Sequence, residues 1–297
     1  MAANDISIKG RKVFFLNLSA DVKERLPIAL REKEYEIYIL DDYRYAKNVL
    51  REYPESMLFV QIDDHDKNQL TTNQWFNFLN SFKSDESLCS TLVGIISKRM
   101  PTSVQHFFML NLPLAAGFLS IRNITGSILS NLQNVLEINN AKGRRQYVRA
   151  RCADDSIDYI NFTFNGKEFN LKLNDISCAG ISCWVSNASA QLFIPNAVLK
   201  DMVLKLGLKT SLKCSTVIFT VKTLTEQKSL LVLLLLPNTT ETTKNAIRNH
   251  VFDVLQNEID SVAFSRPMDE TEYSNEINSQ QPQGFLIDAE NDASESN

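Results

Sequence analysis

The first half of the chain alternates strand-like and helix-like segments five times, and this alternation limits the fold more than any other feature. Short apolar runs bounded by polar residues predict buried strands, and the segments between them predict helices. Strands joined through helices pair in parallel, with helices covering the sheet. The predicted strands are Lys12–Leu18, Glu36–Leu40, Met57–Ile62, Leu92–Ile96 and Ala115–Ile121. The predicted helices are Ala20–Lys33, Asp42–Glu52, Gln74–Phe82, a helix after Pro101, and Thr125–Ile138.

These units predict a flavodoxin-like, doubly wound parallel sheet that resembles the receiver domains of response regulators. A receiver holds Mg²⁺ with acidic residues at the end of its first strand, where this chain has Asn17-Leu18-Ser19. Asp63 follows the third strand, at the place of the phosphate acceptor, and Ser97 ends the fourth strand. The lysine expected after the fifth strand is missing, since the local sequence there is Ser120-Ile121-Arg122. Because one carboxylate is too few for a hard cation, we expect a receiver-like domain with no metal site and no ordinary phosphorylation.

The second half of the chain shows short strand-like runs separated by turns. Asn165-Gly166 lies between two such runs and is typical of a tight hairpin. Antiparallel strands at this spacing predict a small closed barrel, followed by an amphipathic helix that packs on it. The predicted strands are Ile160–Phe164, Glu168–Leu173, Ile181–Val185, Met202–Leu208, Leu212–Val221 and Leu230–Leu236, and the predicted helix is Thr240–Ile259, with an apolar stripe of Ile247, Val251, Val254, Leu255 and Ile259.

The most concentrated positive charge in the chain precedes these strands, at Lys142, Arg144, Arg145, Arg149 and Arg151. This is where we expect an anionic ligand to bind. Arg145 and Arg149 are four residues apart, which places them on one side of a helical turn or lets a flexible segment wrap them around a ligand. Guanidinium groups fork onto phosphate oxygens and donate in pairs to O6 and N7 of guanine. Arg144 is a candidate for a third contact. The alternative is that these side chains only solvate a linker or stabilise a helix end.

A second polar motif, Asp175-Ile-Ser177-Cys-Ala-Gly180, follows at the end of a predicted strand. Aspartate and serine can accept from and donate to a guanine edge. A glycine lets the backbone turn back tightly into the next strand. An ordinary turn between two strands is the alternative interpretation.

Together, in this order and within a strand-rich pattern, the two motifs resemble the RxxxR and [D/N]xSxxG signature of PilZ domains, the bacterial receptors for cyclic di-GMP. The resemblance covers about residues 140–260. It implies a six-stranded antiparallel β-barrel with a C-terminal helix. It also implies that the nucleotide is contacted by Arg145, Arg149, Asp175, Ser177 and Gly180.

The composition argues against several other functions. The chain has 297 residues and a formal net charge of −4, whereas general nucleic-acid binding shows as a basic face or stripe, so we expect no DNA or RNA partner. The five cysteines include no CxxC pair, which argues against a zinc site and a disulfide framework. The three histidines lie in separate segments, and no GxSxG, P-loop or GxGxxG occurs. We therefore expect no enzymatic activity and no cofactor.

The apolar runs of the sequence predict no membrane insertion. The longest, Leu230–Leu236, is far shorter than the ~20 residues that cross a bilayer. The start of the chain lacks the basic-then-apolar pattern of a signal peptide. With reduced cysteines, this predicts a cytoplasmic location.

We expect four segments: a receiver-like domain at 1–138, a basic linker at 139–149, a PilZ barrel domain at 150–262 and an acidic, disordered tail at 263–297. The predicted function is that of a cyclic di-GMP effector. The resemblance implies that it controls motility, adhesion or biofilm behaviour through a partner protein that the sequence does not identify. Two alternatives stay open. One is a phosphorelay output protein that uses Asp63, and the other is a PilZ interaction module that binds no nucleotide.

Overall fold

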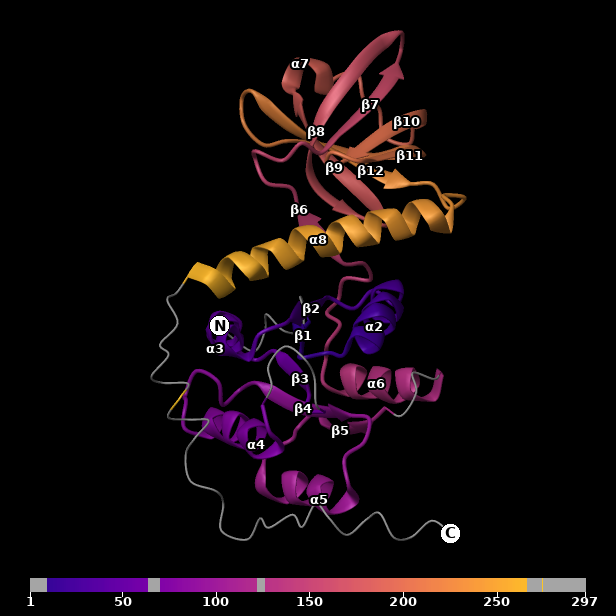
Figure 1. Ribbon diagram of the computed structural model, residues 1–297. Helices are drawn as coiled ribbons and strands as arrows, with labels where there is room; N and C mark the ends of the chain where they lie inside the picture. The colour runs from indigo at the N-terminus through magenta and orange to yellow at the C-terminus, as the bar shows by residue number, and fades with distance from the viewer. Residues whose placement is uncertain (1–9, 64–69, 122–125, 266–273, 275–297) are drawn as a thin grey trace.

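The computed structural model describes residues 10–63, 70–121, 126–265 and residue 274. Arg122 and most of the predicted tail lie outside these residues. The first half of the chain forms a five-stranded sheet in the order β2-β1-β3-β4-β5, with all neighbouring strands parallel (Figure 1). The strands are β1 (Val13–Leu16), β2 (Ile37–Leu40), β3 (Met57–Gln61), β4 (Leu92–Ser97) and β5 (Gly117–Ser120).

Helices cover both faces of this sheet. The connections are α2 (Ala20–Glu32), α3 (Tyr43–Glu52), α4 (Thr72–Asn80), the 3₁₀ turn η1 (Ser81–Lys83), α5 (Thr102–Asn111) and α6 (Gly126–Ile138). On β1, Phe15 packs with α2 and α6, whereas the next side chain, Leu16, belongs to the core under α3, α4 and α5. Strands covered on both faces have no polar side to present, which explains the continuous apolar sequence of β1.

The second half of the chain forms an antiparallel barrel. Strand β8 pairs with both β7 and β9, so that β8-β7-β10-β11-β12-β9 closes into a ring of six strands. A short strand, β6, adds to the other side of β8. The strands are β6 (Arg149–Arg151), β7 (Tyr159–Phe164), β8 (Lys167–Ser177), β9 (Gly180–Ser186), β10 (Val198–Leu206), β11 (Thr210–Thr223) and β12 (Lys228–Leu235). The predicted fold class, a flavodoxin-like sheet followed by a six-stranded barrel and a helix, is confirmed.

The C-terminal helix α8 (Glu241–Ser265) lies between the barrel and the first domain (Figure 1). The sequence predicted a helix packed on the barrel alone. In the structure, the Gln256 side chain also accepts from the Ile39 N–H and donates to the Ile39 carbonyl, both at 2.9 Å. Ile39 belongs to β2, an edge strand whose outer backbone groups would otherwise lack partners in the sheet. The helix thus covers a sheet edge with one face and the barrel with another.

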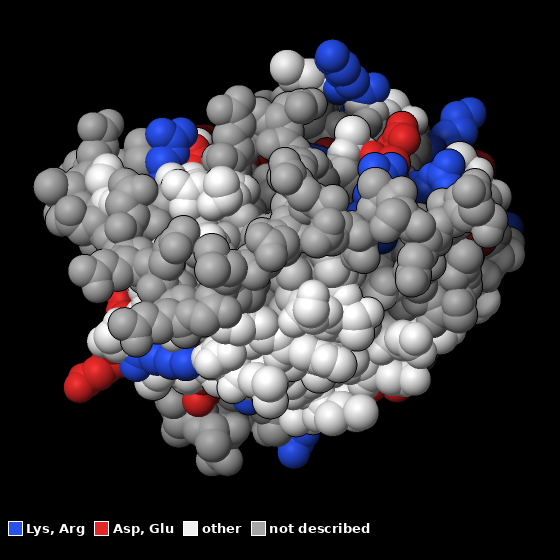
Figure 2. Space-filling model, turned by 60° about the horizontal axis from the view of Figure 1, so that its bottom comes forward, with Lys and Arg blue, Asp and Glu red and all other residues white. Residues whose placement is uncertain are grey.

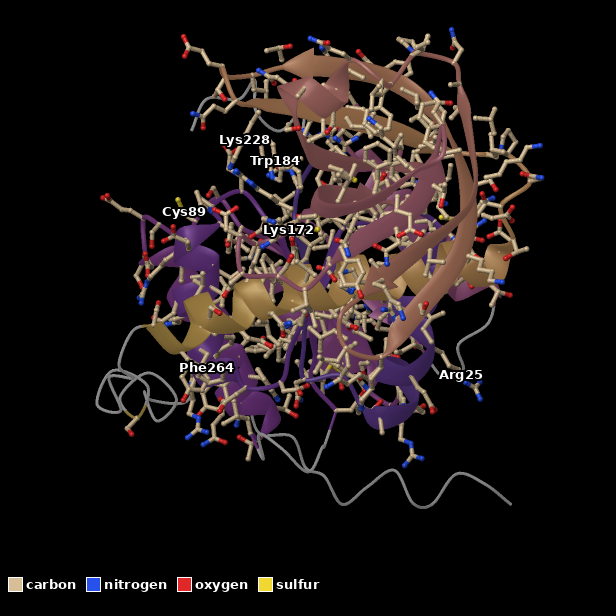
Figure 3. All side chains as sticks on the ribbon, turned by 90° about the horizontal axis from the view of Figure 1, so that it is seen from above. Arg25, Cys89, Lys172, Trp184, Lys228 and Phe264 are labelled. Atoms are coloured by element: carbon tan, nitrogen blue, oxygen red, sulfur yellow. The ribbon has the colours of Figure 1, made fainter. Side chains whose placement is uncertain are left out.

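Some local predictions were incomplete. The sequence analysis missed β6 and the short helix α7 (Asn187–Ala190). It also started β10 too late, because a bulge between Leu199 and Met202, with Asp201 at φ 53°, interrupts the alternation of side chains there. Trp184 is half-buried on β9, where Lys228 Nζ lies 5.8 Å from its ring centroid (Figure 3).

Candidate functional site

The basic arm, residues 139–149, leads from the first domain into β6 in extended and turn conformations. The two arginines of RxxxR are therefore not on one helical turn, and the helical alternative for their spacing is wrong. Arg149 is the first residue of β6 and pairs across the ladder with Ser177 of β8. Its Nη1 lies 3.5 Å from Asp175 Oδ2, so β-sheet pairing brings the two motifs together.

The arginines of the arm differ in their surroundings. Arg149 is half exposed, and Arg144 and Arg145 are exposed. Neither Arg144 nor Arg145 makes a hydrogen bond or ion pair with the described part of the chain. Arg145 and Arg149 line a common cavity, whereas Arg144 does not. The arm therefore offers guanidinium groups that the fold itself has not used.

The second motif forms the hairpin turn between β8 and β9. Asp175 is largely shielded and also accepts from Asn174 Nδ2 at 3.3 Å. Ser177 is buried, and its hydroxyl donates to the Gly180 carbonyl at 3.2 Å. The Ser177 side chain thus holds the turn together in this structure, and Asp175 is the member of the motif that faces the arm.

Gly180 is required for a different reason from the one that the sequence suggested. Its backbone is not in the left-handed region that favours glycine. Instead, Gly180 pairs with Leu234 of β12, and a Cβ built at Gly180 would lie 2.3 Å from the Leu233 carbonyl oxygen. Glycine allows β9 and β12 to approach each other closely, and this contact holds the turn against the barrel wall.

A cavity of about 390 Å³ lies between the arm and the first domain. From the arm it is lined by Lys142, Arg145, Tyr147 and Arg149 among others. Its opposite wall comes from the amino ends of β1, β2 and β3 and from the loop that follows α3. Cavities of roughly 300–1,000 Å³ are typical of small-molecule sites. The sequence analysis missed this wall, because receiver-like sheets bind at the carboxyl ends of their strands.

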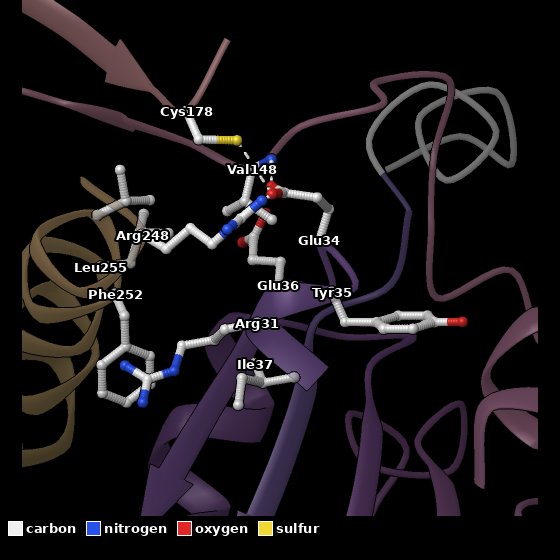
Figure 4. Close-up of a pocket in the computed structure, with 11 residues that line it drawn as sticks. Arg31, Glu34, Tyr35, Glu36, Ile37, Val148, Cys178, Arg248, Phe252 and Leu255 are labelled. Carbon is white, nitrogen blue, oxygen red and sulfur yellow. Dashed lines mark hydrogen bonds and ion pairs between the residues drawn. The ribbon is translucent and has the colours of Figure 1, made fainter. Parts of the chain in front are cut away.

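Glu34 connects the first domain to both motifs and to α8 (Figure 4). Its carboxylate accepts from Arg248 Nε at 2.7 Å, from Cys178 Sγ at 3.0 Å and from the Val148 N–H at 3.2 Å. Cys178 lies inside the hairpin turn of the second motif, and Val148 precedes Arg149. One carboxylate thus joins three segments that are distant in the sequence.

The backbone at Glu34 supports this role. After α2 ends, the Tyr35 N–H bonds to the Leu30 carbonyl and the Glu34 N–H to the Arg31 carbonyl, with Glu34 at φ 61°. This is the Schellman arrangement, in which glycine is the favoured residue. A glutamate in this left-handed conformation carries backbone strain. The hydrogen bonds that its carboxylate accepts offset that strain. The only feature of the sequence that could have indicated this role of Glu34 is a charged residue directly after a predicted helix, at a position typical of glycine.

Burial and the Glu34 contacts change the ionisation of their partners. Burial, together with the hydrogen bond to Glu34, raises the pKa of Cys178 to about 12. Burial alone would lower the pKa of Arg248, but the hydrogen bond to Glu34, together with smaller contributions that include Glu241, raises that pKa above its ordinary value. At neutral pH Arg248 is therefore charged and the Cys178 thiol is neutral.

Asp63 lies in a corner at the carboxyl ends of β3 and β4, which we call the Asp63 corner. Its oxygens accept from Ser97 Oγ at 2.6 Å, from the Lys98 N–H at 2.7 Å and from Gln61 Nε2 at 3.2 Å. Nearby, Lys98 Nζ is 2.7 Å from Asp21 Oδ2. The carboxylate is thus engaged in holding the loop after β4. In the described part of the chain, no group of three or more His, Cys, Asp or Glu side chains is placed to hold a metal ion.

Three further features of the described residues are the distribution of surface charge, the state of the cysteines and the length of the helices. On the face shown in Figure 2, described basic and acidic side chains lie near one another at the edges, with uncharged residues between them. All five cysteines are free thiols, and only Cys89 is exposed. None of the described helices combines the length and the apolar character that a membrane span requires.

Comparison with solved structures finds several similar chains. The chain is similar to MrkH of K. pneumonia in complex with c-di-GMP, with 18% identity and a TM-score of 0.35 over 39% of this chain and 55% of that one. It is also similar to the c-di-GMP-bound PilZ domain of YcgR from Escherichia coli, with 12% identity and a TM-score of 0.36 over 41% of this chain and 98% of that one. The inhibitor of motility MotI of Bacillus subtilis matches 39% of this chain and 53% of its own, with 16% identity and a TM-score of 0.33.

This chain thus covers little more than half of the MrkH and MotI chains. No protein-family model matches the chain, and no curated protein matches it.

Proposed function

We propose that this protein is a receptor for cyclic di-GMP, in which the arm and the β8–β9 turn hold the nucleotide. The observation that carries the proposal is the pairing of β6 with β8, which puts Arg149 of RxxxR beside the turn of the second motif, while Arg145 lines a cavity together with Arg149. Arg145 has no partner in the described chain, and Arg149 has only a long contact with Asp175. A dianionic nucleotide would supply the acceptors that these guanidinium groups lack.

The proposed contacts follow from this geometry. Arg145 and Arg149 bind phosphate oxygens or a guanine edge, and Arg144 adds a contact at the outer side of the arm. Asp175 accepts from the guanine edge and orients Arg149. Ser177 and Gly180 act by holding the turn, since the hydroxyl of one is used inside the turn and the other packs against β12. Guanidinium groups without partners in the described chain, beside a carboxylate, favour binding of an anion, and this supports a receptor rather than an enzyme.

We infer that the nucleotide signal reaches a partner protein through the junction at Glu34. The proposed division of the chain is a receiver-like domain at 1–138, an arm at 139–149, a barrel domain at 150–262 and a tail at 263–297. Ligand binding draws on the arm and the turn, and both are bonded to Glu34 of the first domain. A change in either shifts the balance of contacts between the domains. The proposed output is control of motility, adhesion or biofilm behaviour, in the cytoplasm and without a nucleic-acid partner.

Calorimetric titration of the full chain with cyclic di-GMP tests the proposal, with cyclic di-AMP as the control ligand. The two dinucleotides share charge and backbone, so a preference for the guanine form reports base contacts in addition to phosphate contacts. The expected result is saturable binding of cyclic di-GMP and much weaker binding of cyclic di-AMP. Absence of heat and of competition with cyclic di-GMP at high concentration would sink the proposal.

A further inference from the structure

The cavity beside the arm has a wall that the two motifs do not explain. Arg11, Lys12 and Glu55 contribute to it from the first domain, together with the ring of Tyr53. These residues lie at the amino-end edge of the parallel sheet, just before β1 and β3. The opposite wall carries Arg145 and Tyr147, among other arm residues. The cavity thus combines guanidinium groups, carboxylates and aromatic rings drawn from two domains.

Guanine is the base whose edges match these groups. Its O6 and N7 are acceptors that a guanidinium group can contact in pairs. Its N1–H and N2–H₂ are donors for a carboxylate, and its ring stacks on aromatic side chains. Adenine has a donor where guanine has O6, so a guanidinium group there would meet another donor. A wall that offers both an arginine and a carboxylate therefore favours guanine.

Arg11 is held in place but incompletely bonded. One of its terminal nitrogens donates to the Glu55 carbonyl. Its Nε is shielded from solvent and has no hydrogen-bond partner among the described residues. The other terminal nitrogen, Nη2, makes no hydrogen bond with the described residues and is not shielded, so it can donate to an acceptor on a bound base. Lys12, by contrast, is already engaged, because its Nζ bonds to Glu36 Oε1 at 2.5 Å and to the Tyr38 hydroxyl at 2.6 Å.

Glu55 supplies the complementary group. Its backbone is fixed by the Arg11 contact and by a hydrogen bond from its N–H to Ser90 Oγ at 3.2 Å. Its carboxylate makes no hydrogen bond or ion pair with the described part of the chain. Arg11 and Glu55 are therefore neighbours in the wall, one with an unused donor and the other with unused acceptors. Tyr147, 36% exposed, provides an aromatic face on the arm side.

We propose that this cavity is a guanine pocket, in which Arg11 contacts the O6 and N7 edge of one base of the dinucleotide and Glu55 accepts from its N1–H and N2–H₂. This inference rests on the proposed function and adds the first domain to the receptor. In this arrangement Arg149 contacts a phosphate, while Asp175 of the second motif accepts from a guanine edge as proposed above. The nucleotide then bridges the two domains directly, and base identity is read partly by residues of the first domain.

The test is calorimetric titration of full-length Arg11→Met with cyclic di-GMP, beside the matched control Arg25→Met. Arg25 is exposed on α2, away from the cavity lining (Figure 3). Loss of a paired base contact should weaken binding by about tenfold or more, whereas the control should bind like the parent. The preference for cyclic di-GMP over cyclic di-AMP should also fall in Arg11→Met. In Arg149→Ala both ligands should weaken by a similar factor, because a phosphate contact does not distinguish the bases.

The outcomes of these titrations separate the proposed function from the guanine pocket. If the parent binds no cyclic di-GMP, the proposed function fails and the pocket fails with it. If the parent binds and Arg11→Met retains both affinity and base preference, the pocket is wrong while the proposed function stands. If Arg11→Met lowers the thermal midpoint, Glu55→Gln tests the same pocket through a carboxylate that holds no described residue. Unchanged base preference in Glu55→Gln would then overturn the pocket.

Discussion

The Asp63 corner and the basic arm were both marked by short polar motifs in the sequence, yet the fold uses them in opposite ways. In the corner, the Asp63 carboxylate accepts from Ser97, Lys98 and Gln61. In the arm, Arg145 has no partner in the described chain and Arg149 has a long one. A polar group whose bonding capacity is used within the fold stabilises structure, whereas one left unused is available to a ligand.

The comparison also explains why the phosphorelay alternative is not favoured. The place of the acidic pair of a receiver is taken by Asn17 and Ser19, and both bond to Gln61. The described side chains at this place are therefore an amide and a hydroxyl, not the carboxylates with which a hard divalent cation is usually bound. The hydrogen-bonding capacity of the Asp63 carboxylate is thus used within the fold, by the loop after β4 and by Gln61.

The largest expected effect is on nucleotide binding by the arginines of the basic arm. Replacing Arg145 or Arg149 by alanine should weaken cyclic di-GMP binding by about 1.5–3 kcal/mol each, roughly ten- to more than a hundredfold, because hydrogen bonds to charged groups are lost. Thermal unfolding should hardly change, since both side chains are substantially exposed. Isothermal calorimetry measures the affinity, with Arg25→Ala as control. Parent-like affinity of either arm variant would remove that residue from the site.

The next largest effect is on protein stability and concerns the β8–β9 turn of the second motif. Gly180→Ala should destabilise the protein by about 1–3 kcal/mol, since its methyl group would meet the Leu233 carbonyl in a paired strand. The control is Gly166→Ala at the tip of the β7–β8 hairpin, where nothing lies within 4 Å and only the left-handed backbone opposes the change. Urea unfolding should rank Gly180→Ala as the more damaging. The reverse order would show that β9 and β12 can separate at little cost.

At the Asp63 corner the expected effect is on stability alone. Asp63→Asn keeps the size of the side chain but replaces one acceptor oxygen by a donor, which then faces donors such as the Lys98 N–H. The free energy of unfolding should fall by about 1–2 kcal/mol, with ligand affinity unchanged.

Incubation of the parent with acetyl phosphate and Mg²⁺ gives a second measurement at this corner. It should leave no stoichiometric label. A label that disappears in Asp63→Asn would instead promote the phosphorelay function.

The smallest expected effect is on stability and concerns Asp21, which lies next to the Asp63 corner. The Lys98 ammonium lowers the pKa of Asp21 to about 2, with a smaller contribution from Ser19. This stabilisation is present above the unfolded pKa of about 3.9 and is lost as pH falls through about 2. Because Asp21 is largely exposed, Asp21→Asn should cost only about 0–0.5 kcal/mol at neutral pH, and less in high salt. Urea unfolding at two salt concentrations checks this, and a loss above about 1 kcal/mol would contradict the exposed-pair account.

The sequence predicted most of the architecture because burial leaves a periodic record. The five βα units, the Asn165-Gly166 hairpin and the apolar stripe from Ile247 to Ile259 each appear as local patterns and each is found. β6 was missed because three residues, Arg149 to Arg151, are too few to show an alternation, and their pairing depends on β8. The role of Gly180 was misread because a close approach to β12 leaves no mark near it in the sequence.

By itself, the sequence determined the elements, the two core patterns and the residue types of the candidate site, since propensity and periodicity act over short distances. Only the tertiary structure decided which polar groups remain unused. It placed Glu34 against Arg248, Cys178 and Val148, and it laid α8 along the edge of β2. It also set Arg11 opposite the arm across a cavity. Such contacts join segments that are more than a hundred residues apart, and whether a donor meets an acceptor at that distance depends on how the domains pack.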